Sequence, residues 1–172
     1  QNMTVYLILI GMVVSALFSA MMSIMKFIAD PTTQLPQITY WLMGSFANVT
    51  VKDLPYCALF FLFGVVPLFL LRWRINLLSL SEYEARSMGE NVTSLRIITI
   101  VCATLLTSSS VAMTGGISWV GLVIPHIARL IVGNDARKLL PVSALMGSSF
   151  LLLMDNFSRS LTVAEIPISI LT

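Results

Sequence analysis

The sequence predicts an all-α fold, a polytopic bundle of transmembrane helices, from three observations. Of the 172 residues, 57% are hydrophobic and only 10% are charged, whereas soluble domains carry about 25% charged residues. The mean hydropathy is +0.91, which excludes a disordered chain. Long stretches lack charge, and the net charge of +2 is too small for a nucleic-acid surface. The length allows about four or five helices that cross a bilayer.

Charge-free runs mark the expected spans, because an ionised side chain at bilayer depth costs about 2.5 to 3.5 kcal/mol. The first span covers residues 5–28 and ends before Asp30. Residues 36–46 follow as a short helix, whose Tyr40 and Trp41 suit the membrane interface. This helix is expected to lie at the surface of the bilayer.

The second span covers residues 55–71 and ends at Arg72 and Arg74. Gly64 and Pro67 predict a bend inside the span, which is tolerated where neighbouring helices satisfy the freed carbonyl groups.

Residues 75–96 hold the densest charge in the chain and are expected to form a loop with one short helix. Ser81 and Glu84 have the spacing of a capping box, in which each side chain satisfies a backbone amide at the helix start. Gly89 is expected to end this helix. The segment is therefore predicted to lie outside the bilayer.

Residues 97–128 run without charge for longer than one span needs, and Gly115-Gly116 divide them. This division predicts a third span over 97–113 and a short returning helix over 121–132. Because the chain begins with Gln1 and ends in an apolar stretch, we expect a single transmembrane domain that is a fragment of a longer protein. A last span and the start of a truncated helix are expected at 139–157 and 165–172.

The distribution of lysine and arginine predicts the orientation, since cytoplasmic loops retain these residues. One set of loops holds Arg72, Arg74, Arg86, Arg96, Arg129, Arg137 and Lys138. The opposite side holds Lys26, Lys52 and Arg159. The loop 75–96 and the turn 133–138 are therefore expected in the cytoplasm.

Small side chains recur every four residues in the first span. They form one stripe, which consists of Gly11, Ser15, Ser19 and Ser23, with Met22 beside it. Such a stripe is typical of close helix packing. It is equally typical of a pathway wall, where small hydroxyl groups give a polar solute room and methionine gives adaptable apolar contact.

The short helix of the charged loop also has small residues four apart, Ala85 and Gly89. A solvated loop helix needs no small face, whereas a helix that enters a partner's groove does. We therefore predict a docking helix. Its candidate residues are Leu80, Ser81, Glu82, Glu84, Ala85, Arg86 and Gly89.

The returning helix carries the lone histidine of the chain. A single histidine without further ligands does not make a zinc site. The two cysteines, Cys57 and Cys102, lie in apolar runs and are expected to act as small hydrophobic side chains. His126 and Arg129 are expected to hydrogen-bond neighbouring loops or carbonyl groups, and Pro125 to shape a half-helix. The structural motif comprises Gly121, Pro125, His126 and Arg129.

Asp155 and Arg159 are four residues apart near the non-cytoplasmic end of the last complete span. They are expected to pair along the helix, which lowers the cost of both charges at that depth. A role in receiving an external docking partner is the alternative. The sequence offers no nucleophile with its base and no phosphate-binding glycine loop, so we do not expect an enzyme.

The segment Gly116 to Arg129 resembles the block G-x-I-x-F-V-G-L-x-x-P-H-x-x-R of the permease subunits of type II ABC importers for cobalamin, iron-siderophore and haem, with Trp119 in place of the phenylalanine. Residues 78–89 are similar to the coupling helix of that family. Further matches are Leu140-Pro141, Gly147, Asp155, Arg159 and 165–168. Departures from the family pattern are Ser81, Met88 and Ser169.

The resemblance covers the second half of such a permease, helices five to nine and the start of ten. It implies the cobalamin permease-like fold and a multi-pass protein of the bacterial inner (plasma) membrane, with the first span lining the translocation path at the interface with a second permease copy. It also implies cytoplasmic ATPase subunits, which bind ATP and Mg, and an external substrate-binding protein. No cofactor or metal is expected on this subunit.

The function expected from this resemblance is import of a metal chelate, namely an iron-siderophore, haem or cobalamin, by alternating access. An oxyanion such as molybdate is an alternative substrate for the same fold. A secondary transporter or channel without an ATPase is an alternative of another class, and a structural membrane subunit is a third.

Overall fold

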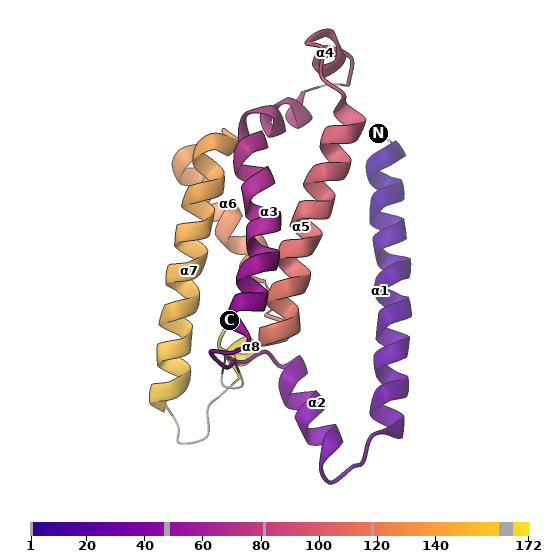
Figure 1. Cartoon of the computed structure of the whole chain (residues 1–172), viewed down its shortest axis with the longest axis vertical. Coiled ribbons are helices and arrows are strands. Elements are labelled where there is room, and N and C mark those ends of the chain that lie inside the picture. Colours follow the sequence, from indigo (N-terminus) through magenta and orange to yellow (C-terminus); the bar gives the residue numbers. More distant parts are fainter. Residues whose placement is uncertain (1, 47–48, 81, 118, 162–166) are drawn as a thin grey trace. The chain divides into compact units, whose positions relative to one another are not determined.

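The computed structural model describes residues 2–46, 49–80, 82–117, 119–161 and 167–172 (Figure 1). These residues contain helices and no strand, so the predicted all-helical fold is confirmed. The chain divides into two compact units, Gln1–Tyr40 and Trp41–Thr172, which are described separately.

The first unit consists of α1 (Asn2–Ile28) and most of α2 (Gln34–Leu42). In the turn between them, the Asp30 carboxylate accepts hydrogen bonds from the Thr32 amide at 2.7 Å and the Thr32 hydroxyl at 2.6 Å. The Asp30 carbonyl accepts from the Gln34 amide at 3.1 Å. These bonds start α2 two residues before the predicted position 36.

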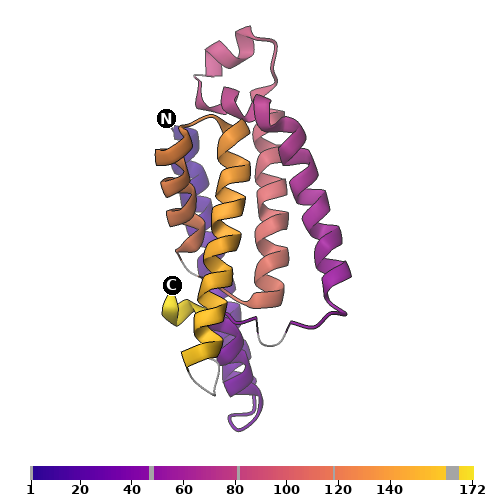
Figure 2. The same ribbon diagram turned by 90° about the vertical axis from the view of Figure 1, so that its left-hand side faces the viewer.

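The second unit contains α3 (Leu54–Ile75), α5 (Val92–Thr114), α6 (Val120–Val132) and α7 (Ala136–Leu161). Helix α3 packs along α5 on one side and contacts α7 on the other, while α6 packs against α7 (Figures 1 and 2). Three short elements complete the unit, namely η1 (Asn76–Ser79), α4 (Glu82–Ser87) and α8 (Ile168–Leu171).

Close packing of α3 on α5 depends on one glycine. Gly64 is buried, and a Cβ atom at this position would lie 2.6 Å from Cγ of Leu106. Leu95 and Cys102 of α5 are also buried. Cys102 and Cys57 are free thiols.

Three chain segments meet at one end of the second unit. The Ser45 amide donates to the Thr114 carbonyl at 2.8 Å, and the Ile168 amide donates to the Gly44 carbonyl at 2.9 Å. Gly44 and Gly115 have φ angles of +71° and +72°, which end α2 and α5 at low steric cost. α2 therefore stops at Leu42, although the sequence predicted helix to residue 46.

Within the described residues, four helices are long and apolar enough to cross a membrane, Val5–Ile28, Leu54–Ser79, Val92–Thr114 and Ala136–Ser160. The helices extend beyond several predicted limits: α3 continues to Ile75 and α5 begins at Val92. Charged residues marked the expected limits, yet a helix does not end where the hydrocarbon ends. Helix α8 begins at Ile168, and the expected start at 165 lies outside the described residues.

Candidate functional site

Basic residues gather at the end of the second unit where α4 lies (Figure 1). The C-terminal ends of α3 and α6 and the N-terminal ends of α5 and α7 bring them together. They are Arg72, Arg74, Arg96, Arg129, Arg137 and Lys138, with Arg86 in α4 itself. Lys52 precedes the start of α3 and Arg159 lies near the end of α7, which are the helix ends opposite to those that carry the basic residues. This asymmetry is the one that the sequence predicted between cytoplasmic and external loops.

Helix α4 ends in a turn built on Gly89. The Met88 amide donates to the Glu84 carbonyl at 3.3 Å, and the Glu90 amide donates to the Ala85 carbonyl at 3.4 Å. Gly89 has a φ of +80°, as expected for a glycine that follows a helix. Ser81 lies outside the described residues, so the expected capping box stays a prediction.

The exposed surface of the α4 segment differs from the predicted one. Ala85 is 0% exposed because α4 packs on η1 and on the start of α5. The expectation that Ala85 offers a small face to a partner was therefore wrong. Tyr83 is 84% exposed and Met88 is 64% exposed, while Gly89 has open space around it. The exposed surface of this segment is thus formed by an aromatic and an apolar side chain, and not by the small side chains that were predicted.

The structural motif of α6 faces away from its packing partner. Ile124 and Ala128 are the buried residues of this helix, which packs against α7. His126 and Arg129 are exposed, and their side chains make no hydrogen bond to the described part of the chain. The predicted contacts to loops and carbonyl groups are thus absent among the described residues, because the helix turns these two residues outward. The remaining members are Gly121, which has open space, and Pro125, which lies inside the helix.

The stripe of α1 lies on one continuous helix, as its spacing requires. The Ser23 hydroxyl donates to the Ser19 carbonyl at 2.9 Å, four residues earlier. A serine bonded in this way keeps its oxygen lone pairs for another donor. The pathway roles of Gly11, Ser15, Ser19, Met22 and Ser23 remain predictions.

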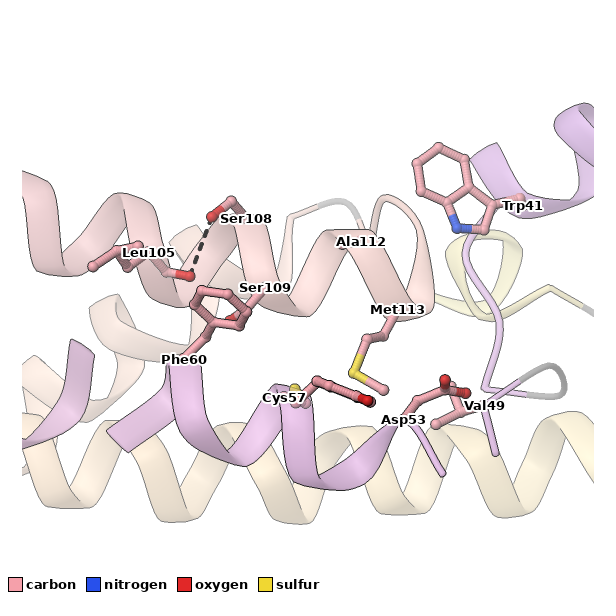
Figure 3. A pocket seen from close by; sticks show the side chains of 11 residues that line it. Trp41, Val49, Asp53, Cys57, Phe60, Leu105, Ser108, Ser109, Ala112 and Met113 are labelled. Atoms are coloured by element: carbon pink, nitrogen blue, oxygen red, sulfur yellow. Dashed lines mark hydrogen bonds between the residues drawn. The ribbon is translucent and has the colours of Figure 1, made fainter. Parts of the chain in front are cut away.

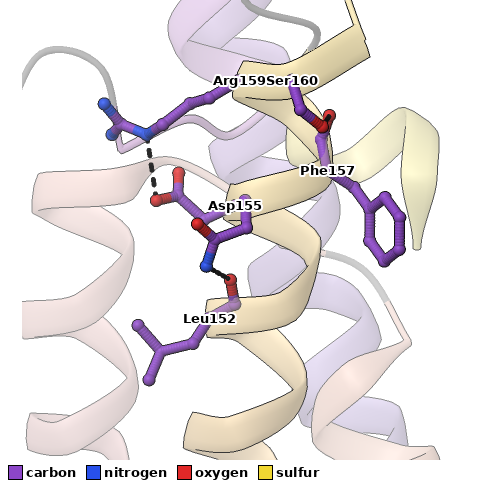
Figure 4. Close-up of polar contacts among 6 residues, drawn as sticks. Leu152, Asp155, Phe157, Arg159 and Ser160 are labelled. Atoms are coloured by element: carbon purple, nitrogen blue, oxygen red, sulfur yellow. Dashed lines mark hydrogen bonds and ion pairs between the residues drawn. The ribbon is translucent and has the colours of Figure 1, made fainter.

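Asp155 and Arg159 form the expected pair along α7 (Figure 4). Nε of Arg159 lies 3.0 Å from Oδ2 of Asp155, and the two side chains are 49% and 23% exposed, respectively. The Asn156 amide group donates to the Leu152 carbonyl at 2.8 Å in the same turn. The pair is therefore accessible at the end of the unit opposite α4.

A pocket between the start of α3 and the end of α5 was not predicted from the sequence (Figure 3). The pocket is lined mainly by apolar side chains. Its volume of about 660 Å³ is in the usual range of small-molecule sites. Hydrogen bonds from Thr50 hold the pKa of Asp53, at its rim, below the ordinary value. Nothing in the sequence indicated this pocket, because its walls come from a loop and from two helices that are distant from each other in the chain. The lining residues include Trp41, Asp53, Tyr56, Cys57, Phe60, Ser108, Ser109 and Met113.

The described residues contain no group of three or more histidine, cysteine, aspartate or glutamate side chains that could hold a metal ion. Charged groups lie at the two ends of the unit, with apolar helices between them. This arrangement suits a body whose helices are embedded in a membrane and whose two ends lie outside it.

Comparison with known proteins shows one family. The model of the FecCD transport family matches residues 1–172. The molybdate import system permease protein MolB of Haemophilus influenzae is 46% identical over 172 residues, which are 100% of this chain and 51% of that protein. A probable iron chelatin transport system permease protein of Helicobacter pylori is 42% identical over 171 residues, which are 99% of this chain and 52% of that protein.

A solved structure is similar along the same stretch. It is described as an inward-facing conformation of a metal-chelate type ABC transporter, with a TM-score of 0.90 and 47% sequence identity. The match covers 95% of this chain and 53% of the other. The chain thus spans about half the length of the relatives that it matches.

Proposed function

The chain belongs to the FecCD transport family, and from this membership we propose that it forms part of the permease subunit of an ATP-driven, binding-protein-dependent importer. The observation that carries the proposal is the family match over all 172 residues, with relatives named as permease proteins. Four helices of membrane-spanning length support a multi-pass membrane location, which we take to be the bacterial inner membrane.

The α4 segment is proposed to be the coupling element. It lies at the arginine-rich end of the second unit, which the positive-inside rule assigns to the cytoplasm. Tyr83 and Met88 are exposed there beside Gly89. Aromatic and methionine side chains are enriched in the cores of protein interfaces. A cytoplasmic ATPase subunit would bind this surface, hydrolyse ATP with Mg, and move the helices between outward and inward access.

The remaining partners are assigned to the end of the second unit opposite α4 and to the stripe of α1. The Asp155–Arg159 pair lies at the end opposite α4, where an external substrate-binding protein would dock. The stripe formed by Gly11, Ser15, Ser19 and Ser23 would line a path shared with a second copy of the permease. The subunit itself is proposed to need no cofactor.

The substrate is proposed to be a metal chelate, such as an iron-siderophore, haem or cobalamin. The similarity to the iron chelatin permease and to the metal-chelate type transporter supports this class. An oxyanion such as molybdate is the second candidate, which the 46% identity to a molybdate permease favours.

Reconstitution tests the proposal. The full-length permease that carries this sequence would be placed in proteoliposomes with its ATPase and binding protein, and uptake of radioactive molybdate and of a radioactive ferric siderophore would be measured. We expect uptake of one probe only when ATP and an active ATPase are present. Uptake driven by an ion gradient without the ATPase would instead establish a secondary transporter. No uptake of either probe would refute molybdate and the ferric siderophore as substrates.

A further inference from the structure

Glu90 connects the α4 segment to α3 through an ion pair. The Glu90 amide donates to the Ala85 carbonyl at the end of α4. The carboxylate of the same Glu90 lies 3.1 Å from Nε of Arg74 in α3, with side-chain exposures of 20% for Glu90 and 53% for Arg74. Glu90 thus contacts both the end of α4 and the end of α3.

The end of α3 is tied in turn to the start of α7. Asn76 caps α3, and its amide nitrogen donates to the Asp135 carboxylate at 2.8 Å. The side-chain oxygen of Asn76 accepts from the Ala136 amide at 2.7 Å. Asn76 therefore uses both its donor and its acceptor on one turn, which fixes the orientation of its amide plane.

The Asn76 side chain supplies a hydrogen-bond acceptor that the first turn of α7 lacks. The first amides of a helix have no intrahelical acceptor, and in α7 the Ala136 amide finds one in Asn76. Asp135 caps the same helix, because its carboxylate accepts from the Arg137 amide at 3.0 Å. The guanidinium of Arg137 also lies over the Trp73 ring, 5.7 Å from its centroid. The start of α7 is thus held by Trp73 of α3 and by Asn76, the residue that caps α3.

We propose that Asn76 and Asp135 form a clamp that positions α7 on the end of α3, so that movement of α4 through Glu90 and Arg74 reaches α7 in the transport cycle. The clamp rests on the proposed function, since it needs an ATPase that moves α4. Asn76 and Asp135 are 59 residues apart: Asn76 directly follows α3 as the first residue of η1, and Asp135 directly precedes α7. Without the clamp, α3 would move while α7 lagged, and ATP would be hydrolysed without import.

The test compares four variants of the full-length permease, reconstituted with its ATPase and binding protein. Asn76→Ala removes both clamp bonds, and Asn134→Ala is the matched control, because Asn134 is an exposed asparagine of the same turn. The exchange variant, Asn76→Asp with Asp135→Asn, keeps a carboxylate facing an amide. Glu90→Gln removes the ion pair between Glu90 and Arg74. It provides a second, independent test of the proposal if Asn76→Ala does not fold.

The measured quantity is the amount of ATP hydrolysed per molecule of molybdate or ferric siderophore imported, whichever the wild type takes up. Asn76→Ala, which loses two hydrogen bonds, and Glu90→Gln, which loses the ion pair, are each expected to raise this ratio about fivefold. Asn134→Ala is expected to leave the ratio unchanged, and the exchange variant to return it to within about twofold of the wild type.

A merely structural role would lower import and hydrolysis together and leave the ratio unchanged. An unchanged ratio in both Asn76→Ala and Glu90→Gln would therefore overturn the clamp, as would an exchange variant that couples no better than Asn76→Ala. Uptake by the wild type that needs neither ATP nor an active ATPase would overturn the proposed function itself, and so the two failures are distinct.

Discussion

Gly64 of α3 faces Leu106 of α5 so closely that a Cβ atom at position 64 would lie 2.6 Å from Cγ of Leu106 and 3.1 Å from the Cys102 carbonyl oxygen. Neither atom is the free end of a flexible side chain. The missing side chain at Gly64 therefore sets the distance between the two helices, as small residues do in membrane bundles.

Gly64→Ala is expected to destabilise the permease by about 1 to 3 kcal/mol, the usual cost of overpacking. The midpoint of thermal unfolding in detergent measures it. Gly121→Ala is the control, since open space surrounds Gly121. Adding Leu106→Ala to Gly64→Ala should recover part of the loss because it removes the clash, whereas strictly additive effects would contradict the contact.

Alanine substitutions at Gly115 and Gly133 distinguish the cost of backbone strain from the cost of a steric clash. Both have positive φ angles, +72° and +80°, but a Cβ atom at Gly115 would meet the Trp41 carbonyl oxygen, while Gly133 has open space. Gly133→Ala should cost about 1 to 2 kcal/mol, and Gly115→Ala considerably more. Equal unfolding midpoints for the two variants would show that the contact between Gly115 and Trp41 has no energetic weight.

Gly89→Arg is expected to abolish co-purification of the ATPase, because a long charged side chain would stand beside Tyr83 and Met88 on the proposed docking surface. Gly89→Asn is the control, since asparagine tolerates the φ of +80° better than other residues with a side chain. The asparagine variant should retain the ATPase. Retention by the arginine variant would exclude docking at this turn.

Asp135 predicts a dependence of stability on pH. The Asn76 amide group, followed by the Arg137 amide, holds the pKa of this carboxyl group below its ordinary value. The bonds therefore contribute their full stability above the ordinary pKa of an aspartate, and this contribution is lost as the pH falls through the lowered pKa. Unfolding midpoints measured against pH should fall in acid more steeply for the wild type than for Asp135→Asn. Parallel curves would contradict this role.

Ser19→Trp tests the pathway assigned to α1. A bulky side chain in the stripe is expected to block uptake while assembly with the ATPase stays intact. Leu17→Trp is the control, because two residues in a helix turn a side chain by about 200° to another face. Normal uptake by Ser19→Trp, or equal loss in both variants, would count against a path along the stripe.

Much of the fold follows from local sequence. Charge-free runs predicted helices that the structure has, and Gly115-Gly116 predicted where α5 ends, because a charge or a glycine acts on its own turn. Helix limits were predicted less well, as α3 and α5 continue past the charges that flank the apolar runs. Side chains such as Arg74 reach water from within a helix, so a charge does not end one.

The candidate site was predicted only in part. The segment 80–89 was placed at the arginine-rich end, and the pairing of Asp155 with Arg159 follows from their spacing. The exposed face of α4 was not predicted, since a helix this short shows no periodicity that distinguishes Ala85 from Tyr83. The outward direction of His126 was missed for a similar reason, as α6 is apolar on most of its surface.

By itself, the sequence determined that this protein is helical, that it belongs in a membrane, and which end of its helices carries the positive charge. These properties depend on composition and on neighbours along the chain. Tertiary structure alone decided that Ala85 is covered, that a pocket lies between α3 and α5, and that Asn76 meets Asp135. Each of these depends on helix ends or faces that are distant in sequence, and their meeting is set by packing such as that of Gly64 on Leu106.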